Sequence, residues 1–462
     1  MTSNNLKTNE FPCRDHPSAP GGRARFPGAS GAARMPALDQ GAGRRDAVMV
    51  VAGFPPQVKV LAQLLTDEGR LRAFVTGFVH KPAAAFDRAC ALADRVFGSR
   101  LMARLQKRGI PGVDPALCHR LTLTELFCHA WLSLPLVRRW RIACNDFRNR
   151  AIERCATRLI DAGTALVFGR QDAALESFRR ARRVGARTVY ELPAAYHKVV
   201  KSIMEREDAL FPGVSDLPGA AEDFAPARTE IVDEELQLAD LVIVGSEFVQ
   251  TSLATADFPL PKVAVLPYAC EDSWLADVPQ GQAPSSPKNL VLHVGRLGTR
   301  KGTHRLLRAW RRTGAYRSHR LRLVGSMHLS RRFLKDFAGC YEHVPWMARH
   351  ELRAQYAAAD FFVLPSAAEG FALVILEALA CGLPVVASRN SGAQGFLEHG
   401  THGLLHEFGD EEELCGQVDW MLSHPKERAE MSRHAREKAA SWTWSDYRQR
   451  LREIVFGLDG QG

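Results

Sequence analysis

Short apolar runs alternate with longer amphipathic stretches along most of the chain from residue 47 onward. Residues 47–51 (AVMVV), 241–245 (LVIVG) and 359–365 (ADFFVLP) are nearly unbroken apolar segments of strand length. Strands that are buried on both faces of a parallel sheet have this composition, and the helices between them provide the crossovers. We therefore expect an α/β protein built on parallel sheets.

The same pattern predicts further strands and the helices that connect them. Gly or Pro follows many of the apolar runs, which ends a strand and starts a turn. Helical spacing takes over between these turns. Further strands are expected at residues 165–169, 188–190, 262–267, 289–294, 321–325 and 385–388, and helices at residues 205–212, 223–239, 373–380 and 411–440.

Composition divides the chain into segments. At 462 residues it is too long for one compact α/β core, so we expect two domains. Residues 1–46 are rich in Gly, Ala, Pro and Arg and predict a disordered tail. Residues 276–288 are dense in Pro, Gln, Ser and Gly and predict the linker between the domains. The domains would then be residues 47–275 and 289–440, followed by a helical segment at 441–462.

Apolar runs and cysteines bear on where the protein works. No run approaches the roughly 18 residues that a membrane-spanning helix needs, and the N-terminus lacks the apolar core of a signal peptide. The ten cysteines are scattered without a C-x-x-C pair, which fits the reduced thiols of a cytosol. We therefore expect a cytoplasmic protein.

The formal charge of +10 includes a strongly basic stretch at residues 94–158. Trp140, Cys144, Phe147 and Ala151 recur there at the spacing of one helix face. Such a helix can lie on the anionic inner face of a membrane, or it can turn its apolar stripe to the protein core. Nucleic-acid binding is not expected, because no recognised binding module accompanies the charge. The arginines of the stretch that lie off this stripe include Arg138, Arg139, Arg141, Arg148, Arg150, Arg154 and Arg158.

The most informative stretch is residues 364–388 (LPSAAEGFALVILEALACGLPVVAS). Glu369 lies in a loop between the strand before it and the helix at 373–380, and Glu377 lies inside that helix. The loop leaves the carboxyl end of a parallel strand, where open α/β sheets bind ligands. Two carboxylates in this arrangement can accept hydrogen bonds from hydroxyl groups at two points of one extended polyol. A nucleotide sugar has that shape.

A second motif, residues 295–302 (GRLGTRKG), follows the first strand of the second domain. Arg296 and Lys301 lie here at the mouth of a helix. Arg supplies a planar fork of donors and Lys a point charge, a combination that suits a diphosphate. Without a metal, these two cations would have to neutralise the departing nucleotide diphosphate.

The two motifs resemble the signature of family 4 glycosyltransferases, which are retaining enzymes with the GT-B fold. The first reads E-G-F-x-L-x-x-x-E-A-x-A-x-G-x-P-V-V in this chain, and the second is G-R-x-x-x-x-K-G. The resemblance covers residues 47–460 and is strong over 240–460. It implies two Rossmann-like parallel-sheet domains facing each other across a cleft. It also implies that the segment from residue 441 packs back on the first domain.

The resemblance further implies a role for each residue of the two motifs. Arg296 and Lys301 would contact the phosphates of the donor. Glu369 would hold hydroxyl groups of the donor sugar, and Glu377 would hold the ribose. The rest of the donor pocket would be formed by Gly370, Phe371, Ala372, Leu373 and Gly325, the first three through backbone amides.

The sequence gives weaker indications of the residues that would bind the acceptor. Gly53 ends the first strand and would permit close backbone approach to a ligand, or would simply make a βα turn. Glu191 and His197 follow the strand at 188–190, again at a carboxyl end, together with Tyr190 and Tyr196. A structural histidine is as good an interpretation of His197 as a contact to a sugar hydroxyl.

The chain contains no D-x-D, no H-E-x-x-H and no clustered Cys and His. We therefore expect no metal and no cofactor, with a nucleotide-diphosphate sugar as the donor substrate. The resemblance implies retaining transfer of the sugar to a hydroxyl of a glycan or lipid-linked acceptor, in glycan or exopolysaccharide assembly. A sugar-nucleotide 2-epimerase and a non-catalytic binding protein on a GT-B scaffold stay open as alternatives. Glycoside hydrolysis also uses two carboxylates, but Glu369 and Glu377 share one strand-loop-helix, which fits holding a ligand better than flanking a scissile bond.

Overall fold

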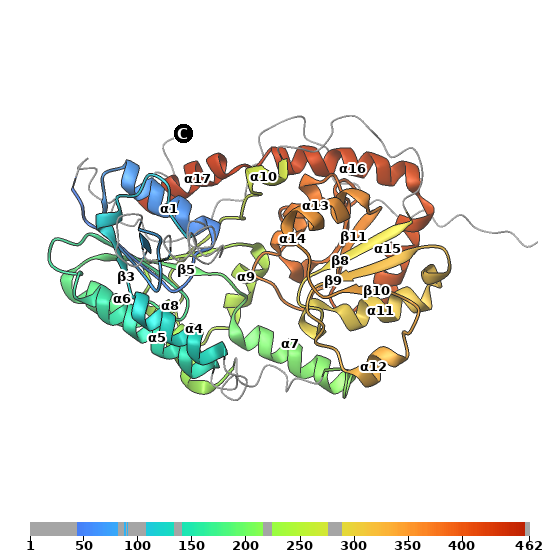
Figure 1. Ribbon diagram of the computed structural model, residues 1–462, viewed down its shortest axis with the longest axis horizontal. Coiled ribbons are helices and arrows are strands. Elements are labelled where there is room, and N and C mark those ends of the chain that lie inside the picture. Colours follow the sequence, from blue (N-terminus) through green and yellow to red (C-terminus); the bar gives the residue numbers. More distant parts are fainter. Residues whose placement is uncertain are drawn as a thin grey trace, which may run out of the picture. The chain divides into compact units, whose positions relative to one another are not determined.

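Two parallel β-sheets with helices between their strands make up the described part of the chain (Figure 1). The computed structural model describes residues 44–81, 87–88, 90, 108–133, 141–215, 224–275 and 289–457. The predicted linker, and the predicted tail apart from residues 44–46, lie outside the described residues, as do residues 94–107 and 134–140 of the basic stretch.

The first sheet has seven strands in the order β3-β2-β1-β4-β5-β6-β7, each parallel to its neighbours. The order reverses between β1 and β4, as in doubly wound folds. All five residues of β1 are buried, which explains its unbroken apolar sequence. The strands are β1 (Ala47–Val51), β2 (Leu71–Thr76), β3 (Cys118–Arg120), β4 (Leu166–Arg170), β5 (Arg187–Leu192), β6 (Leu241–Val244) and β7 (Lys262–Val265).

The second sheet has six strands in the order β10-β9-β8-β11-β12-β13, and it is also entirely parallel. Its order reverses between β8 and β11. The prediction of two Rossmann-like parallel sheets is therefore confirmed, and we call the units around them the first and second domain. The strands are β8 (Leu290–Val294), β9 (Arg320–Val324), β10 (Glu342–Val344), β11 (Phe361–Leu364), β12 (Val385–Ser388) and β13 (Gly403–His406).

The helices follow the predicted alternation with two differences. Residues 411–440 form two helices, because Pro425 has no N–H to continue the first one and instead begins the second. Helix α7 begins at His197, well before residue 205. The helices are α1 (Pro56–Asp67), α4 (Thr122–Ser133), α5 (Arg141–Thr157), α6 (Leu175–Val184), α7 (His197–Leu210), α8 (Pro226–Leu238), α9 (Glu247–Ser252), α10 (Asp272–Leu275), α11 (Thr303–Arg312), α12 (Arg331–Lys335), α13 (Arg349–Ala358), α14 (Leu373–Ala380), α15 (Glu411–Ser423), α16 (Pro425–Ala440) and α17 (Trp444–Phe456).

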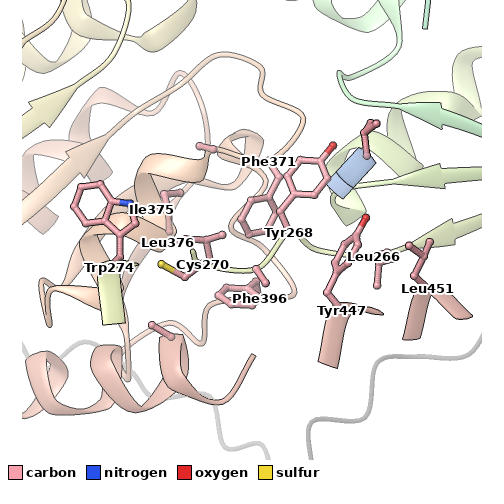
Figure 2. Packing of buried hydrophobic residues seen from close by; sticks show 14 of the residues in the cluster. Leu266, Tyr268, Cys270, Trp274, Phe371, Ile375, Leu376, Phe396, Tyr447 and Leu451 are labelled. Atoms are coloured by element: carbon pink, nitrogen blue, oxygen red, sulfur yellow. The ribbon is translucent and has the colours of Figure 1, made fainter. Parts of the chain in front are cut away.

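A single hydrophobic cluster contains buried residues of both sheets, and Figure 2 shows part of it. Tyr268, which follows β7, packs edge-on against Phe371 with 6.0 Å between the ring centroids. Phe371 packs in the same way against Phe396 at 5.6 Å. Aromatic pairs in this geometry add to the free energy gained by burial. The loop between β11 and α14 is thereby held against the end of the first domain.

The last helix, α17, lies along α1 of the first domain (Figure 1). Arg448 pairs with Asp67, and the Trp442 indole N–H donates to Pro267 O at 3.0 Å. The chain therefore passes from the second domain back to the first before it ends.

Helix α5 divides the predicted apolar stripe. Cys144 is buried, whereas 52% of Phe147 is exposed. Ile152 and Ala156 are fully buried in the first domain, and packing against α6 and β1 turns the helix toward them. Among the described residues of the stripe, Cys144 therefore faces the core and Phe147 faces outward.

Helix α7 connects the first domain to α11 of the second. Glu207, near the end of α7, is 1% exposed and accepts hydrogen bonds from Arg305 Nε at 2.8 Å and Nη2 at 2.6 Å. His304 Nε2 lies 2.9 Å from the same carboxylate. Just beyond α7, Gly213 O accepts a hydrogen bond from Ser330 Oγ at 2.6 Å. Polar contacts in a buried setting thus join the two domains.

Substituting Glu207 by Gln should lower the free energy of unfolding by about 3 kcal/mol, because Arg305 would remain buried without a countercharge. Urea denaturation of the full chain measures the change. Glu205→Gln, an exposed position on the same helix, is the matched control and should change stability by less than about 0.5 kcal/mol. Equal effects of the two substitutions would contradict a connecting role for Glu207.

Candidate active site

The loops after β8 and β11 meet at the point where the strand order of the second sheet reverses. Both leave the carboxyl ends of neighbouring parallel strands, the edge at which open α/β sheets bind ligands. The Ala367 N–H donates to Arg300 O at 2.8 Å, and Arg300 Nε donates to Ala368 O at 3.1 Å. The two predicted motifs are distant in sequence but form one surface.

Lys301 and Glu369 form an ion pair on this surface, with 3.0 Å between Nζ and Oε1 and only 18% and 16% of the side chains exposed. Arg296, on the same loop as Lys301, is exposed and has no ion-pair partner among the described residues. The surface therefore presents two cations and one carboxylate. Within the described ranges, no three His, Cys, Asp or Glu side chains gather in a way that could hold a metal ion.

Two glycines allow the loops of the second domain to approach each other. Gly302 has φ +66°, and a Cβ there would lie 1.8 Å from Pro365 O. Gly325, after β9, has φ +133°, and its Cβ would lie 1.8 Å from Gly295 O. No side chain fits at either position. Gly325 thus shapes the backbone beside the Arg296 loop.

His293 stabilises the loop that carries Lys301, a role that the sequence analysis missed. It is fully buried in β8, and burial lowers its pKa to about 4. Nδ1 of the neutral ring lies 2.8 Å from Val363 O, which can only accept, so Nδ1 carries the proton and donates to this oxygen. Nε2 therefore accepts a hydrogen bond from Thr303 Oγ1 at 2.9 Å. This ring joins β8, β11 and the start of α11. A histidine inside the apolar strand LVLHV was the available signal.

The loop after Glu369 lies against the first domain. A Cβ on Gly370 would lie 1.7 Å from Pro193 O, and Ser246 Oγ donates to Gly370 O at 2.5 Å. The Ala372 N–H donates to Ser391 O at 3.2 Å, so this amide is engaged within the protein. The Gly370 and Phe371 amides have no such partner among the described residues. They remain the amides of this loop that can meet a ligand.

Glu377 lies in the middle of α14, and Leu373 begins that helix with 41% of its surface exposed. Tyr356 donates its hydroxyl to Glu377 Oε2 at 3.1 Å. Burial raises the pKa of Glu377 to about 7, against the opposing effect of the Tyr356 hydrogen bond. The carboxylate is therefore poised to lose its proton when hydroxyl donors reach its free oxygen.

Glu191 lies inside β5, near its carboxyl end, and not in the loop after it. It is buried, and it accepts hydrogen bonds from Gln57 Nε2 at 2.7 Å, Arg170 Nε at 3.1 Å and the Tyr268 hydroxyl at 3.1 Å. This carboxylate holds neighbouring elements of the protein together. Gly53 lies next to Arg170, because a Cβ added to this glycine would be 3.5 Å from Arg170 Nη1. The φ of Gly53 is not positive. Neither residue is brought to the surface that carries Lys301.

His197 lines a cavity of about 230 Å³. It is the first residue of α7 and not part of a loop, and its Nε2 lies 2.7 Å from Asp233 Oδ1. Asp172 and Arg228, which the sequence analysis missed, pair with each other in the wall at 2.6 Å. The remaining wall comprises Gln171, Leu192, Ala194, Ala195, Tyr196, Val200, Phe224, Thr229, Val232 and Arg300.

Known proteins resemble this chain in sequence. Residues 277–438 match the family model of glycosyl transferases group 1. A GDP-mannose-dependent alpha-(1-6)-phosphatidylinositol monomannoside mannosyltransferase of Mycolicibacterium smegmatis is 30% identical over 243 residues, which are 47% of this chain and 63% of that protein. A D-inositol 3-phosphate glycosyltransferase of Corynebacterium urealyticum is 38% identical over 108 residues, 23% of this chain and 26% of that protein. The chain thus spans less than two thirds of either relative.

Solved structures resemble the chain over nearly its whole length. A sucrose-phosphate synthase from Thermosynechococcus elongatus has a TM-score of 0.57 at 18% identity, covering 90% of this chain and 99% of that one. HepE of Anabaena in complex with UDP has a TM-score of 0.53 at 18% identity, covering 89% and 100%. The chain therefore has the GT-B fold, and its residues 277–438 are similar to the group 1 glycosyltransferases.

Replacing Glu377 by Gln should change how stability depends on pH. The native pKa of about 7 lies above the unfolded value of 4.5, so the native state holds the proton longer and loses stability as pH rises from 4.5 to 7. The variant should lack this loss, which amounts to about 2 to 3 kcal/mol. Urea unfolding of both proteins between pH 4.5 and 8 measures the difference.

The comparison between the two proteins is needed because Glu235 and Glu153 have raised pKa values of about 8 and about 7 and contribute in the same pH range. These two residues are unchanged in the variant, so their contribution cancels. Parallel pH profiles for wild type and variant would show that Glu377 is not the titrating group.

Proposed function

We propose that this protein is a glycosyltransferase that moves a sugar from a nucleotide-diphosphate sugar to a hydroxyl of a glycan or lipid-linked acceptor. The observation that carries the proposal is the Lys301–Glu369 pair beside the unpaired Arg296. The pair lies on the surface where the two loops meet, so the phosphates of a ligand can replace Glu369 as the countercharge of Lys301. A diphosphate would take Lys301 and Arg296 as countercharges and release Glu369 to accept hydrogen bonds from sugar hydroxyls.

We infer that the transfer is retaining and needs neither a metal nor a cofactor. The bond between the anomeric carbon and the diphosphate oxygen breaks, and the acceptor oxygen bonds to the same face of that carbon. The acceptor proton passes to a phosphate oxygen of the leaving group. Arg296 and Lys301 stabilise the negative charge that develops on the diphosphate, and Glu369 orients the sugar.

Known relatives support a nucleotide-sugar donor. HepE of Anabaena, a structural relative, was solved with UDP and with UDP-glucose. The mannosyltransferase relative is named as GDP-mannose-dependent. Both nucleotides therefore belong in a first binding test. Glu377, whose carboxylate has a pKa near 7, is the residue that we assign to the ribose hydroxyls.

The wild-type protein should gain thermal stability with the logarithm of the concentration of one nucleotide diphosphate from a panel of UDP, GDP and ADP. Arg296→Ala should weaken that binding by about tenfold to a hundredfold, because a charge-assisted contact is lost. Glu369→Gln should bind the nucleotide at least as tightly, since Lys301 is released, but should transfer sugar far more slowly. Thermal shift titration and a transfer assay with the matching nucleotide sugar measure the two effects.

Arg331→Ala, at an exposed position on α12, is the control and should behave as wild type. If no nucleotide stabilises the folded protein, the transferase proposal fails. If a nucleotide sugar is bound but is converted to its epimer, the epimerase interpretation replaces transfer. Unchanged turnover in Glu369→Gln would show that the site residue is wrongly assigned.

We also propose that the enzyme works in the cytoplasm at the inner face of a membrane, in exopolysaccharide or cell-envelope assembly. In the part of the chain that the structure describes, no helix is long and apolar enough to cross a bilayer. Helices α4 and α5 instead expose a surface made of Leu123 (84%), Phe127 (53%) and Phe147 (52%), with Arg150 and Arg154 exposed beside it.

The exposed face of α5 supports an anionic bilayer as the occupant of this surface. Phe147, Arg150 and Arg154 follow each other at intervals of three and four residues, so they share one side of the helix. Phe127 of α4 packs edge-on against Phe147 at 6.1 Å. Aromatic side chains beside arginines match the boundary between acyl chains and anionic headgroups.

The protein should co-sediment with phosphatidylcholine vesicles only when these contain phosphatidylglycerol. The double substitution Arg150→Glu and Arg154→Glu should lower the partition coefficient at least about tenfold, since each nearby cation contributes about 1 kcal/mol. Arg331→Glu with Arg332→Glu on α12 is the matched control. Wild-type protein that stays in the supernatant at low salt would rule out this location.

A further inference from the structure

We infer that the cavity beside the donor loops binds an acceptor with a single polyol ring and an anionic group, and that Arg300 recognises the anion. The inference rests on the proposed function, because it names the second substrate of the same site. The cavity of about 230 Å³ lies below the usual range of about 300–1,000 Å³ for ligand pockets. A space of this size suits one sugar or cyclitol ring at the reacting end of the acceptor.

The cavity lies next to the reaction site. Arg300 in its wall is the sequence neighbour of Lys301 and donates through Nε to Ala368 O, one residue before Glu369. Ala194 of the cavity wall also lies close to Gly370, with 3.3 Å between the Ala194 Cα and a Cβ added to that glycine. A ring bound in the cavity would therefore adjoin the loop that we assign to the donor sugar.

Arg300 is the cation of the cavity that has no carboxylate partner among the described residues. The other arginine in the wall, Arg228, is paired with Asp172, and His197 is paired with Asp233. Asp233 is further occupied by the Tyr196 hydroxyl at 2.7 Å. The Nε bond to Ala368 O orients the Arg300 guanidinium, whose Nη groups form a fork that fits a phosphate or a carboxylate.

The opposite wall is built rigidly enough to position a ring. Asp172 is not a glycine yet has φ +69°, a conformation that persists only where the surroundings impose it. The fully buried Glu235 accepts the Asp172 N–H at 3.1 Å, the Ala174 N–H at 2.8 Å and the Tyr190 hydroxyl at 2.6 Å. Gln171 and Thr229 add polar groups to this wall. These groups suit ring hydroxyls, and Arg300 suits a charge.

The test uses isothermal titration of the full chain, saturated with the nucleotide diphosphate that stabilises it, so that the cations of the donor site are occupied. Inorganic phosphate, glucose 6-phosphate, glucuronate and glucose are the probes. At least one anionic sugar should bind more tightly than glucose. Arg300→Gln should weaken that binding by about tenfold to a hundredfold, a larger effect than any change in nucleotide affinity. Arg331→Gln is the control and should match wild type.

The possible outcomes distinguish the acceptor inference from the proposed function. Nucleotide binding without any preference for anionic probes rules out the anionic acceptor and leaves the proposed function in place. Loss of nucleotide affinity in Arg300→Gln assigns this residue to the donor phosphates. Failure of every nucleotide to bind removes the proposed function itself. Dependence on Arg300 for glucose 6-phosphate but not glucuronate, or the reverse, identifies the anion as a phosphate ester or a carboxylate.

Discussion

The close contact of the β11–α14 loop with the first domain is the constraint on which the candidate site depends. Gly370 approaches Pro193 O too closely for any side chain, and Ser246 holds its carbonyl oxygen. Phe371, the next residue, is fixed by Tyr268. Glu369 itself belongs to the second domain, but the next residue, Gly370, packs against the first domain. A change at this contact would displace the donor-binding carboxylate and the wall of the acceptor cavity together.

Several buried ionisable groups of the two domains are neutral or compensated. His293 is kept uncharged by burial, and its two hydrogen bonds fix the start of α11 without adding a charge beside Lys301. Glu191 is satisfied by three donors, and Glu235 by three more. Arg296, the Lys301–Glu369 pair and Arg300 are the charges that we assign to ligands. This arrangement suits a reaction whose main demand is to stabilise charge on a leaving diphosphate.

The sequence allowed the sheets and the meeting of the two motifs to be predicted, and the reason is topological. Apolar runs identify buried parallel strands, and such strands bring the residues after their carboxyl ends to one edge, which is why both motifs could be assigned to one site without coordinates. The orientation of single side chains was less accessible. Phe147 could not be placed because the rotation of α5 is set by its tertiary partners. The burial of Glu191 could not be predicted, because the three groups that donate hydrogen bonds to it come from distant segments of the chain.

Some features leave almost no trace in a sequence. The positive φ of Asp172 is imposed by Glu235, which lies more than sixty residues away in the chain. Arg300 is one more cation of the motif at residues 295–302, but its lack of a carboxylate partner among the described residues becomes visible only when the charges around it are placed. The proposed donor side thus rests on sequence motifs, whereas the proposed acceptor side rests on the geometry.

Helix α7 has a mechanical consequence. Its first turn is attached to the first domain through His197 and Asp233, and its last turn is attached to the second through Glu207 and Arg305. A helix of 14 residues is about 21 Å long and resists compression, so it acts as a strut of fixed length between the two attachments. Any rocking of one domain on the other must pivot about the ends of this strut.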